Sequence, residues 1–173
     1  MEAADDSENS YNHDRCICIY LDMSVNQSLL PALPCMCGSF RRTSRALTQL
    51  YEQALRPLGL RASQFTILQV LALAGEVTQG QLGEMLAMDS TSLTRTLGIM
   101  ARQGWITAHR GKDRRERRLD LASSGERQLQ KALPVWEKVQ SRLRRQLGVQ
   151  AWKNLLELTH QATRVVKMQG DSL

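Results

Sequence analysis

The middle of the chain carries the feature that most restricts its fold, which is two short helix-forming segments in close succession. Thr78-x-x-Gln81 has the form of a capping box that opens the first helix. The second helix is predicted to begin near Asp89 or Ser90 and to run to about Gln103. The predicted buried faces hold Leu82, Met85 and Leu86 in the first helix and Leu93, Leu97 and Met100 in the second. Two short helices joined by a tight turn predict a helix-turn-helix unit.

A charge-dense segment between two strand-like segments follows directly. Trp105 to Ala108 is predicted as a short strand and Arg117 to Leu121 as a second one. Between them lies HRGKDRRER, which is turn-like at Gly111. The hairpin carries six cations, which are Arg110, Lys112, Arg114, Arg115, Arg117 and Arg118, against the acids Asp113 and Glu116. Cations this crowded favour a polyanion nearby, although an isolated charge run is also typical of a solvated surface.

Further helices flank this unit on both sides. An apolar stripe predicts a first helix from Cys37, and Pro57 with Gly59 should end it. The stripe comprises Phe40, Thr43, Leu47, Leu50, Ala54 and Leu58. Ser63 is predicted to cap the next helix, which Gly75 closes, and its buried face should hold Phe65, Leu68 and Leu71 or Ala72.

Two helices are predicted after the hairpin. Ser123-x-x-Glu126 has the form of another capping box, opening a long helix to Leu147 that Pro134 should kink or break. Gly148 separates a last helix. The sequence thus predicts a mainly α fold with a small β-hairpin.

The charge distribution indicates the kind of partner. Residues 1–34 carry six acidic side chains and one basic one, whereas the remainder carries 22 basic and 11 acidic ones. We expect the acidic leader to be disordered. A strongly basic body favours a polyanion, most often nucleic acid. No apolar stretch is long enough to span a membrane and no secretory signal is evident, so we predict a cytoplasmic location without membrane contact.

The sequence offers little support for an enzyme. It contains no Ser/His/Asp or Cys/His arrangement, no phosphate-binding glycine loop and no pair of carboxylates in a cleft-like context, so we predict neither catalysis nor a cofactor. Four cysteines form two Cys-x-Cys pairs, Cys16/Cys18 and Cys35/Cys37. A thiolate metal-binding protein or a thiol enzyme is therefore the alternative from another class. The single-residue gap is shorter than structural zinc sites use, so we predict no metal site, although soft metals stay open.

The second helix of the helix-turn-helix unit has a polar face suited to DNA. Hydroxyl groups of Ser and Thr reach phosphates or base edges, and Arg95 can pair with a phosphate or a guanine. The segments LRASQFTILQVLA and TQGQLGEMLAMDSTSLTRTLGIMARQGWI, then Asp113-Arg114-Arg115 and RRLDLASSGE, resemble the MarR family of bacterial winged helix-turn-helix regulators. The resemblance extends over about residues 35–168.

That resemblance implies an intertwined homodimer that binds double-stranded DNA, most often as a repressor. Residues 35–62 and 123–168 would form the dimerisation helices, and residues 63–122 the DNA-binding lobe. Recognition helices would enter successive major grooves of a pseudo-palindromic operator, and the hairpin wings would enter minor grooves. The implied DNA-contacting residues are Thr78, Gln79, Ser90, Thr91, Ser92, Thr94, Arg95, Arg110, Lys112, Arg114, Arg115 and Arg117. Asp113 would anchor the wing, and which of Arg114, Arg115 and Arg117 inserts stays open.

Cysteine positions favour an oxidant as the effector. Cys37, at the start of the first helix, is similar in position to the peroxide-reactive cysteine of the organic-hydroperoxide-sensing branch, and Tyr51 matches a tyrosine that hydrogen-bonds the thiol there. A helix N-terminus stabilises a thiolate. Arg41 and Ala62 replace other tyrosines of the branch, and Cys35 is an additional thiol. We therefore predict release from the operator by thiol oxidation at Cys37 and Cys35.

An alternative effector is a small aromatic or phenolic compound, with the cysteines as inert apolar fillers of an interface. A pocket between the dimerisation helices and the DNA-binding lobe would hold it. Its candidate lining residues are Phe40, Tyr51, Phe65, Trp105 and Trp136. Aromatic side chains at helical spacing are also typical of a core, so the two interpretations stay open.

Overall fold

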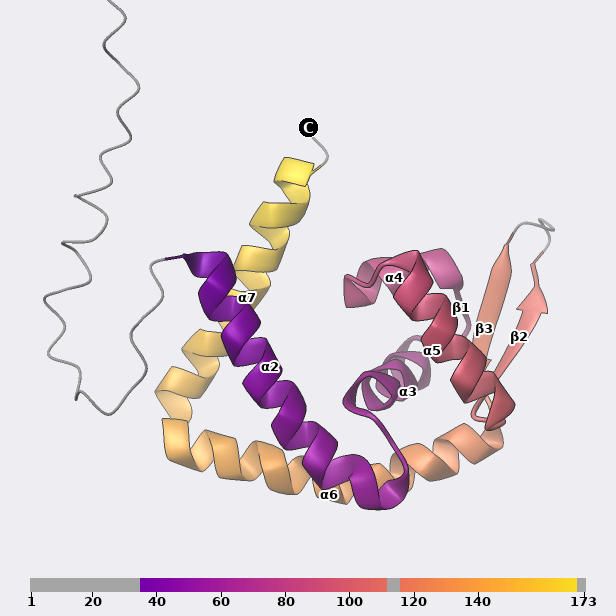
Figure 1. Cartoon of the computed structure of the whole chain (residues 1–173), viewed down its shortest axis with the longest axis horizontal. Coiled ribbons are helices and arrows are strands. Elements are labelled where there is room, and N and C mark those ends of the chain that lie inside the picture. The colour runs from indigo at the N-terminus through magenta and orange to yellow at the C-terminus, as the bar shows by residue number, and fades with distance from the viewer. Residues whose placement is uncertain (1–34, 112–115, 171–173) are drawn as a thin grey trace, which may run out of the picture. The chain divides into compact units, whose positions relative to one another are not determined.

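The computed structural model describes residues 35–111 and 116–170, with side chains described to residue 167. Its elements, drawn in Figure 1, are α2 (Met36–Leu55), the 3-10 turn η1 (Arg56–Leu58), α3 (Ala62–Ala74), β1 (Val77–Thr78), α4 (Gln79–Leu86), α5 (Ser90–Arg102), β2 (Ile106–Arg110), β3 (Arg117–Leu121), α6 (Ser123–Leu147) and α7 (Val149–Gly170). The chain divides into two compact units, residues 1–49 and 50–173, and the boundary falls within α2. The predicted leader lies outside the described residues.

In the first unit, the described part is the beginning of α2. The amide of Ser39 donates to the carbonyl of Cys35 at 3.0 Å, which closes the first turn of the helix. Large apolar side chains of the predicted stripe remain exposed here, including Phe40 and Leu47. Leu55, beyond the unit boundary, is the buried residue of α2. The predicted helix is therefore confirmed, but a single chain leaves the first half of its apolar stripe exposed to solvent.

In the second unit, three antiparallel strands form one small sheet in the order β1-β3-β2. Ile106 pairs with Leu121 and Arg110 with Arg117, so the predicted hairpin is confirmed. Strand β1, which the sequence did not predict, adds two pairs to β3, Val77 with Leu119 and Thr78 with Arg118. A two-residue strand leaves no alternation to detect, so β1 depends on the neighbouring strand rather than on its own pattern.

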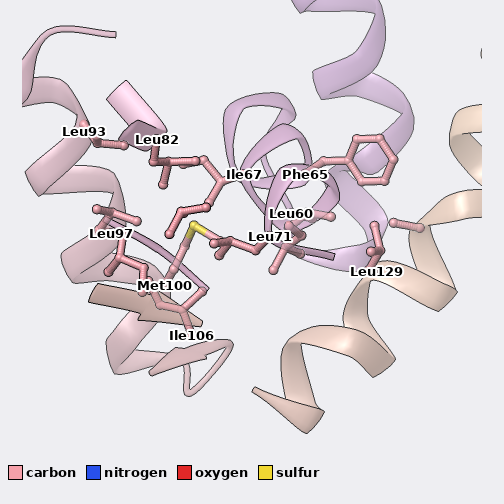
Figure 2. Packing of buried hydrophobic residues seen from close by; sticks show 14 of the residues in the cluster. Leu60, Phe65, Ile67, Leu71, Leu82, Leu93, Leu97, Met100, Ile106 and Leu129 are labelled. Atoms are coloured by element: carbon pink, nitrogen blue, oxygen red, sulfur yellow. The ribbon is translucent and has the colours of Figure 1, made fainter. Parts of the chain in front are cut away.

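The core of the second unit lies between α3, α4, α5 and the sheet. Helix α3 is apolar on nearly all sides and buries Phe65, Ile67, Leu68 and Leu71. Figure 2 shows Leu82, Ile67, Leu71, Leu97 and Met100 directed toward one another from these helices. The predicted buried face of α5, Leu93, Leu97 and Met100, is confirmed with at most 1% exposure. Leu82 is also buried, but Met85 is exposed, so the predicted face of α4 is too wide.

Helix ends follow the predicted signals with two exceptions. Gly59 has φ 65°, in the left-handed region, and ends η1 where Pro57 and Gly59 predicted a stop. Arg61, not Ser63, is the N-cap of α3, because Gln64 returns its side chain to the Arg61 amide at 3.0 Å and starts the helix earlier. Helix α6 begins at Ser123 as predicted, but its N-cap is Ala122, which has no capping hydroxyl.

The predicted capping box at Ser123 is therefore wrong, and other contacts fix the start of α6. Ser124 Oγ donates to the carbonyl of Gly104, and Gly125 lies so close to the Trp105 backbone that a Cβ there would collide with it. Helix α6 continues through Pro134 to Leu147, so a break there is wrong, whereas a kink at Pro134 stays a prediction, and Gly148 separates the helix from α7. Among residues 35–111 and 116–170, no helix is long and apolar enough to cross a bilayer.

Candidate nucleic-acid interface

Two capping arrangements hold α4 and α5 in place. The amide of Thr78 donates to Gln81 Oε1 at 2.9 Å, and the amide of Gln81 donates to Thr78 Oγ1 at 3.1 Å, so the predicted capping box is confirmed. Asp89 caps α5 by accepting the Ser92 amide at 2.8 Å. That backbone hydrogen bond holds the pKa of the Asp89 carboxyl below its ordinary value. A carboxylate is therefore kept at the positive end of the α5 dipole.

The polar face of α5 is open to solvent. The exposed residues at its start are Ser90, Thr91, Ser92, Thr94 and Arg95. The buried residues Leu93 and Leu97 fix the opposite face of the helix, so the polar side chains face outward. Gln79 Nε2 donates to Thr94 Oγ1 at 2.8 Å and joins the first turn of α4 to the middle of α5. Two of the predicted DNA-contacting residues are therefore already bonded to each other.

A surface groove of about 620 Å³ gathers predicted residues from three elements. Thr78 and Gln79 line it from the start of α4, Ser90 from the start of α5, and Arg117 from the start of β3. The glycines Gly80 and Gly83 keep one wall low, since they add no side chain. The groove brings together hydroxyl, amide and guanidinium donors, the groups that proteins use on phosphates and base edges, and the carboxylates of Glu84 and Glu116 also line it.

The described part of the wing is strongly basic on one face. Arg110 and Arg117 are exposed and lie directly opposite each other on β2 and β3. Like charges that face each other across two strands are destabilising unless an anion compensates them. Lys112, Asp113, Arg114 and Arg115 lie outside the described residues.

The other face of the wing carries an ion-pair network that the sequence did not reveal. Glu76, between α3 and β1, accepts from Arg118 Nη1 at 2.8 Å and lies 2.9 Å from His109 Nε2. Arg118 also pairs with Glu116 at 3.3 Å. The hydrogen bond from Arg118 holds the pKa of Glu76 below its ordinary value, and the pKa of Arg118 is raised in turn. Arg118 is thus compensated inside the chain and is not one of the hairpin cations that need an anion from outside.

No local pattern reveals this network, because Glu76 and Arg118 are separated by 42 positions. Only strand pairing places His109 opposite Arg118 and both beside Glu76. The network joins the base of the wing to the turn before β1. It adds side-chain contacts to the pairing of β1 with β3, which already joins the hairpin to the lobe.

Comparison with known proteins identifies this arrangement. A family model described as the MarR family matches residues 58–116. The transcriptional regulator MosR of M. tuberculosis, solved in a complex with DNA, is 34% identical, with a TM-score of 0.66 over 76% of this chain and 98% of that chain. A mutant MarR from E. coli, solved with operator DNA, is 22% identical, with a TM-score of 0.65 over 71% of this chain and 89% of that chain.

The chain belongs to the MarR family. A further relative is YwoH of Bacillus subtilis, described as an uncharacterized HTH-type transcriptional regulator, which is 28% identical over 86 residues. That match spans 50% of this chain and 63% of YwoH. The predicted winged helix-turn-helix fold is confirmed, and the relatives are transcriptional regulators.

The candidate sensor residues of this MarR-family chain lie along α2. Cys35 immediately precedes the helix and Cys37 lies in its first turn, and both are exposed free thiols. Tyr51 is half-buried, and burial raises the pKa of its phenol. Cys16 and Cys18 lie outside the described residues. In the part of the chain that the structure describes, no three His, Cys, Asp or Glu side chains cluster as metal ligands.

Three of the aromatic residues predicted as candidates for lining a ligand pocket, Phe65, Trp105 and Trp136, lie in the hydrophobic core or against it. Phe65 is buried and its ring centroid lies 6.0 Å from that of Trp136, so this pair belongs to the core. Trp105 is partly buried against the same core. A different groove, of about 680 Å³, lies between the end of α4 and α7. It is lined by Met85, Leu86, Ala87, His160, Thr163 and Arg164.

Proposed function

We propose that this MarR-type transcriptional regulator binds a pseudo-palindromic duplex operator as a homodimer and represses transcription there. The observation that carries the proposal is the groove that joins Thr78, Gln79, Ser90 and Arg117 beside the exposed face of α5. A helix of 13 residues whose buried face is fixed and whose first turns present hydroxyls and Arg95 fits a major groove. The 34% identical MosR, solved with DNA, supports the same use here.

Exposed apolar side chains on α7 support the homodimer. Five large apolar side chains of this 22-residue helix are each at least 39% exposed: Leu155, Leu156, Leu158, Val165 and Val166. An apolar surface of this kind marks an interaction site in a folded protein. A second copy would supply the same surface under two-fold symmetry. The α5 helices of the two copies in the dimer would then read half-sites centred about 10 bp apart.

DNA binding is tested by fluorescence anisotropy with the chain's own upstream region and with random duplex. The variant Arg95→Ala/Arg117→Ala removes one cation from α5 and one from the wing. We expect its Kd for the upstream region to rise by about 10- to 100-fold, since a well-placed base contact contributes about 1–3 kcal/mol. Arg45→Ala/Arg56→Ala, at exposed positions outside α5, the wing and α7, is the matched control and should bind like wild type. Equal affinities of wild type and Arg95→Ala/Arg117→Ala would contradict the proposed interface.

Thiol oxidation is the proposed release mechanism. The Cys37 thiolate attacks an oxygen of an organic hydroperoxide, the O–O bond breaks, and a sulfenic acid and an alcohol form after proton transfer. A second thiol, from Cys35 of the other subunit or from Cys16 or Cys18, then attacks the sulfenic sulfur and releases water as the disulfide forms. Exposure of both thiols and the position of Cys37 in the first turn of α2 support this step.

Cys37→Ser tests the switch. Wild-type affinity should fall after stoichiometric organic hydroperoxide and return with dithiothreitol, whereas Cys37→Ser should bind DNA equally in both conditions. Cys35→Ser is the matched control, and it distinguishes the attacking thiol from the resolving one, because it should still form the sulfenic acid. A full peroxide response in Cys37→Ser would remove Cys37 from the mechanism.

A second candidate effector is a small aromatic carboxylate or phenolate. The groove between α4 and α7 combines the apolar Met85 and Leu86 with the cation Arg164, which suits such a compound. Benzoate and 4-hydroxybenzoate are suitable probes. If they weaken DNA binding in wild type but not in Arg164→Ala, and peroxide has no effect, the ligand mechanism replaces the thiol switch.

A further inference from the structure

The charges of α6 are distributed unevenly around the helix. Five cations follow one another at steps of four, seven, four and three residues, and we call them the basic stripe: Arg127, Lys131, Lys138, Arg142 and Arg145. At about 100° per residue, these steps keep all five within an arc of roughly 60°. Because α6 runs unbroken from Ser123 to Leu147, the stripe follows one face of the helix for about 27 Å.

The basic stripe is exposed and uncompensated within the chain. All five side chains are exposed. Among the described residues, none of the five takes part in an ion pair. The nearest acids on the helix, Glu126 and Glu137, project about 80–100° away from the near edge of the stripe by the same helical arithmetic. The stripe therefore lines up five cations on one face of α6, and the acid nearest to it, Glu126, lines a groove with Arg127 and Lys131 at its first turn.

A second copy of this chain does not fit such a surface. A two-fold interface brings the same patch of both subunits together, and two basic stripes would repel each other. The exposed apolar side chains of α7 offer that copy a complementary surface instead. An occupant of the stripe must carry closely spaced negative charge.

We propose that the basic stripe binds the phosphate backbone of duplex DNA beyond the operator bases that α5 and the wing contact. The inference rests on the proposed function, because it assigns a second surface to the same ligand. Over about 27 Å a duplex presents roughly 16 phosphates, one per 1.7 Å of its axis, so five cations find partners without a special sequence. Gln130 borders the stripe on α6, is exposed, and can donate a further hydrogen bond to a phosphate oxygen.

The experiment compares two duplexes from the upstream region, one trimmed to the two half-sites and one extended by about 10 bp at each end, or one helical turn. Kd is measured by anisotropy over a range of salt concentrations for three proteins. They are wild type, the stripe variant Lys131→Gln/Lys138→Gln/Arg142→Gln, and the control Arg45→Gln/Arg56→Gln/Lys153→Gln, which removes the same charge from exposed positions off the stripe. Far-UV circular dichroism tests whether each variant is folded. If a triple variant is unfolded, the three single variants are measured in its place.

We expect wild type and control to bind the extended duplex at least tenfold more tightly than the trimmed one, with a steeper salt dependence. The stripe variant should bind the trimmed duplex like wild type but should show no gain from the flanks. Its slope of log K against log salt should fall by about 0.9 for each phosphate that the variant no longer neutralises. Absence of a flank gain in wild type, or an unchanged gain in the stripe variant, overturns the inference. Failure of wild type to bind even the trimmed duplex contradicts the proposed function instead.

Discussion

The DNA-binding lobe and α7 use apolar residues in opposite ways. Within the lobe, α3 and α5 bury Ile67, Leu68, Leu97 and Met100 completely, and the sheet adds Leu119. In α7, a helix whose apolar content is similar to that of α5, none of the described side chains is buried. The lobe thus obtains its core from a single chain, whereas α7 leaves its large apolar side chains exposed, which supports the proposed homodimer. Folding therefore depends on the core of the lobe, and the exposed face of α7 is the proposed assembly surface.

The largest expected effect is that of truncating a core side chain. Leu97→Ala leaves a cavity at a fully buried position of α5 and should lower the free energy of unfolding by about 2–5 kcal/mol. Leu73→Ala, at a side chain that is 89% exposed on α3, should change it by less than about 0.5 kcal/mol. Urea unfolding followed by circular dichroism measures both. Similar decreases for the two variants would refute the assignment of the core.

Charge on the exposed face of α7 should separate subunits without unfolding the lobe. Leu155→Glu/Leu158→Glu places two carboxylates on a face that the partner would cover, and we expect the dimer Kd to rise at least about 100-fold, or 2.7 kcal/mol. Sedimentation velocity measures the dissociation, and proteolysis resistance of the lobe is the control. A dimer that persists in this variant would place the interface elsewhere.

Removal of the α4 cap should have a moderate effect. Thr78→Ala removes the oxygen that accepts the Gln81 amide, which should cost about 1 kcal/mol of unfolding free energy. Thr78→Ser retains the hydroxyl and is the matched control. Thermal unfolding of both variants makes the comparison, and equal destabilisation would show that the methyl group rather than the cap matters.

The smallest expected effect is at the base of the wing. Glu76→Gln removes the charge that holds Arg118 and His109, so we expect a DNA affinity about two- to threefold weaker. Because the pKa of Glu76 is lowered in the folded state, its contribution is fully present above the ordinary value of 4.5 and is lost as the pH falls through the lowered pKa. Unfolding of wild type and Glu76→Gln should therefore differ at neutral pH and converge in acid. A constant difference across this range would contradict this role of the carboxylate.

The sequence predicted the parts of the lobe that local signals specify. The capping box at Thr78, the bounds of α5 near Asp89 and Gln103, and the strand from Arg117 to Leu121 are confirmed because caps, periodicity and turn residues act over a few positions. Strand β1 and the Glu76 network were missed because both depend on pairing with residues about 40 positions away. The error at Ser123 is one of position, since Ala122 is the N-cap and Ser123 is already the first residue of the helix.

For the candidate site, the sequence identified Thr78, Gln79, Ser90 and Arg117, and the structure places all four around one groove. It did not predict that Gln79 binds Thr94, because the crossing of α4 and α5 sets that contact. Whether these residues touch DNA stays a prediction, as does the role of Cys37.

A footprint of the reduced chain on its own upstream region tests the central claim most directly. We predict two protected major-groove patches, related by a dyad, with centres about 10 bp apart and minor-groove protection outside them. Arg95→Ala/Arg117→Ala should lose both patches together. A single unsymmetrical patch, or protection no stronger than on random duplex, would contradict a dimer that reads DNA through α5 and the wing.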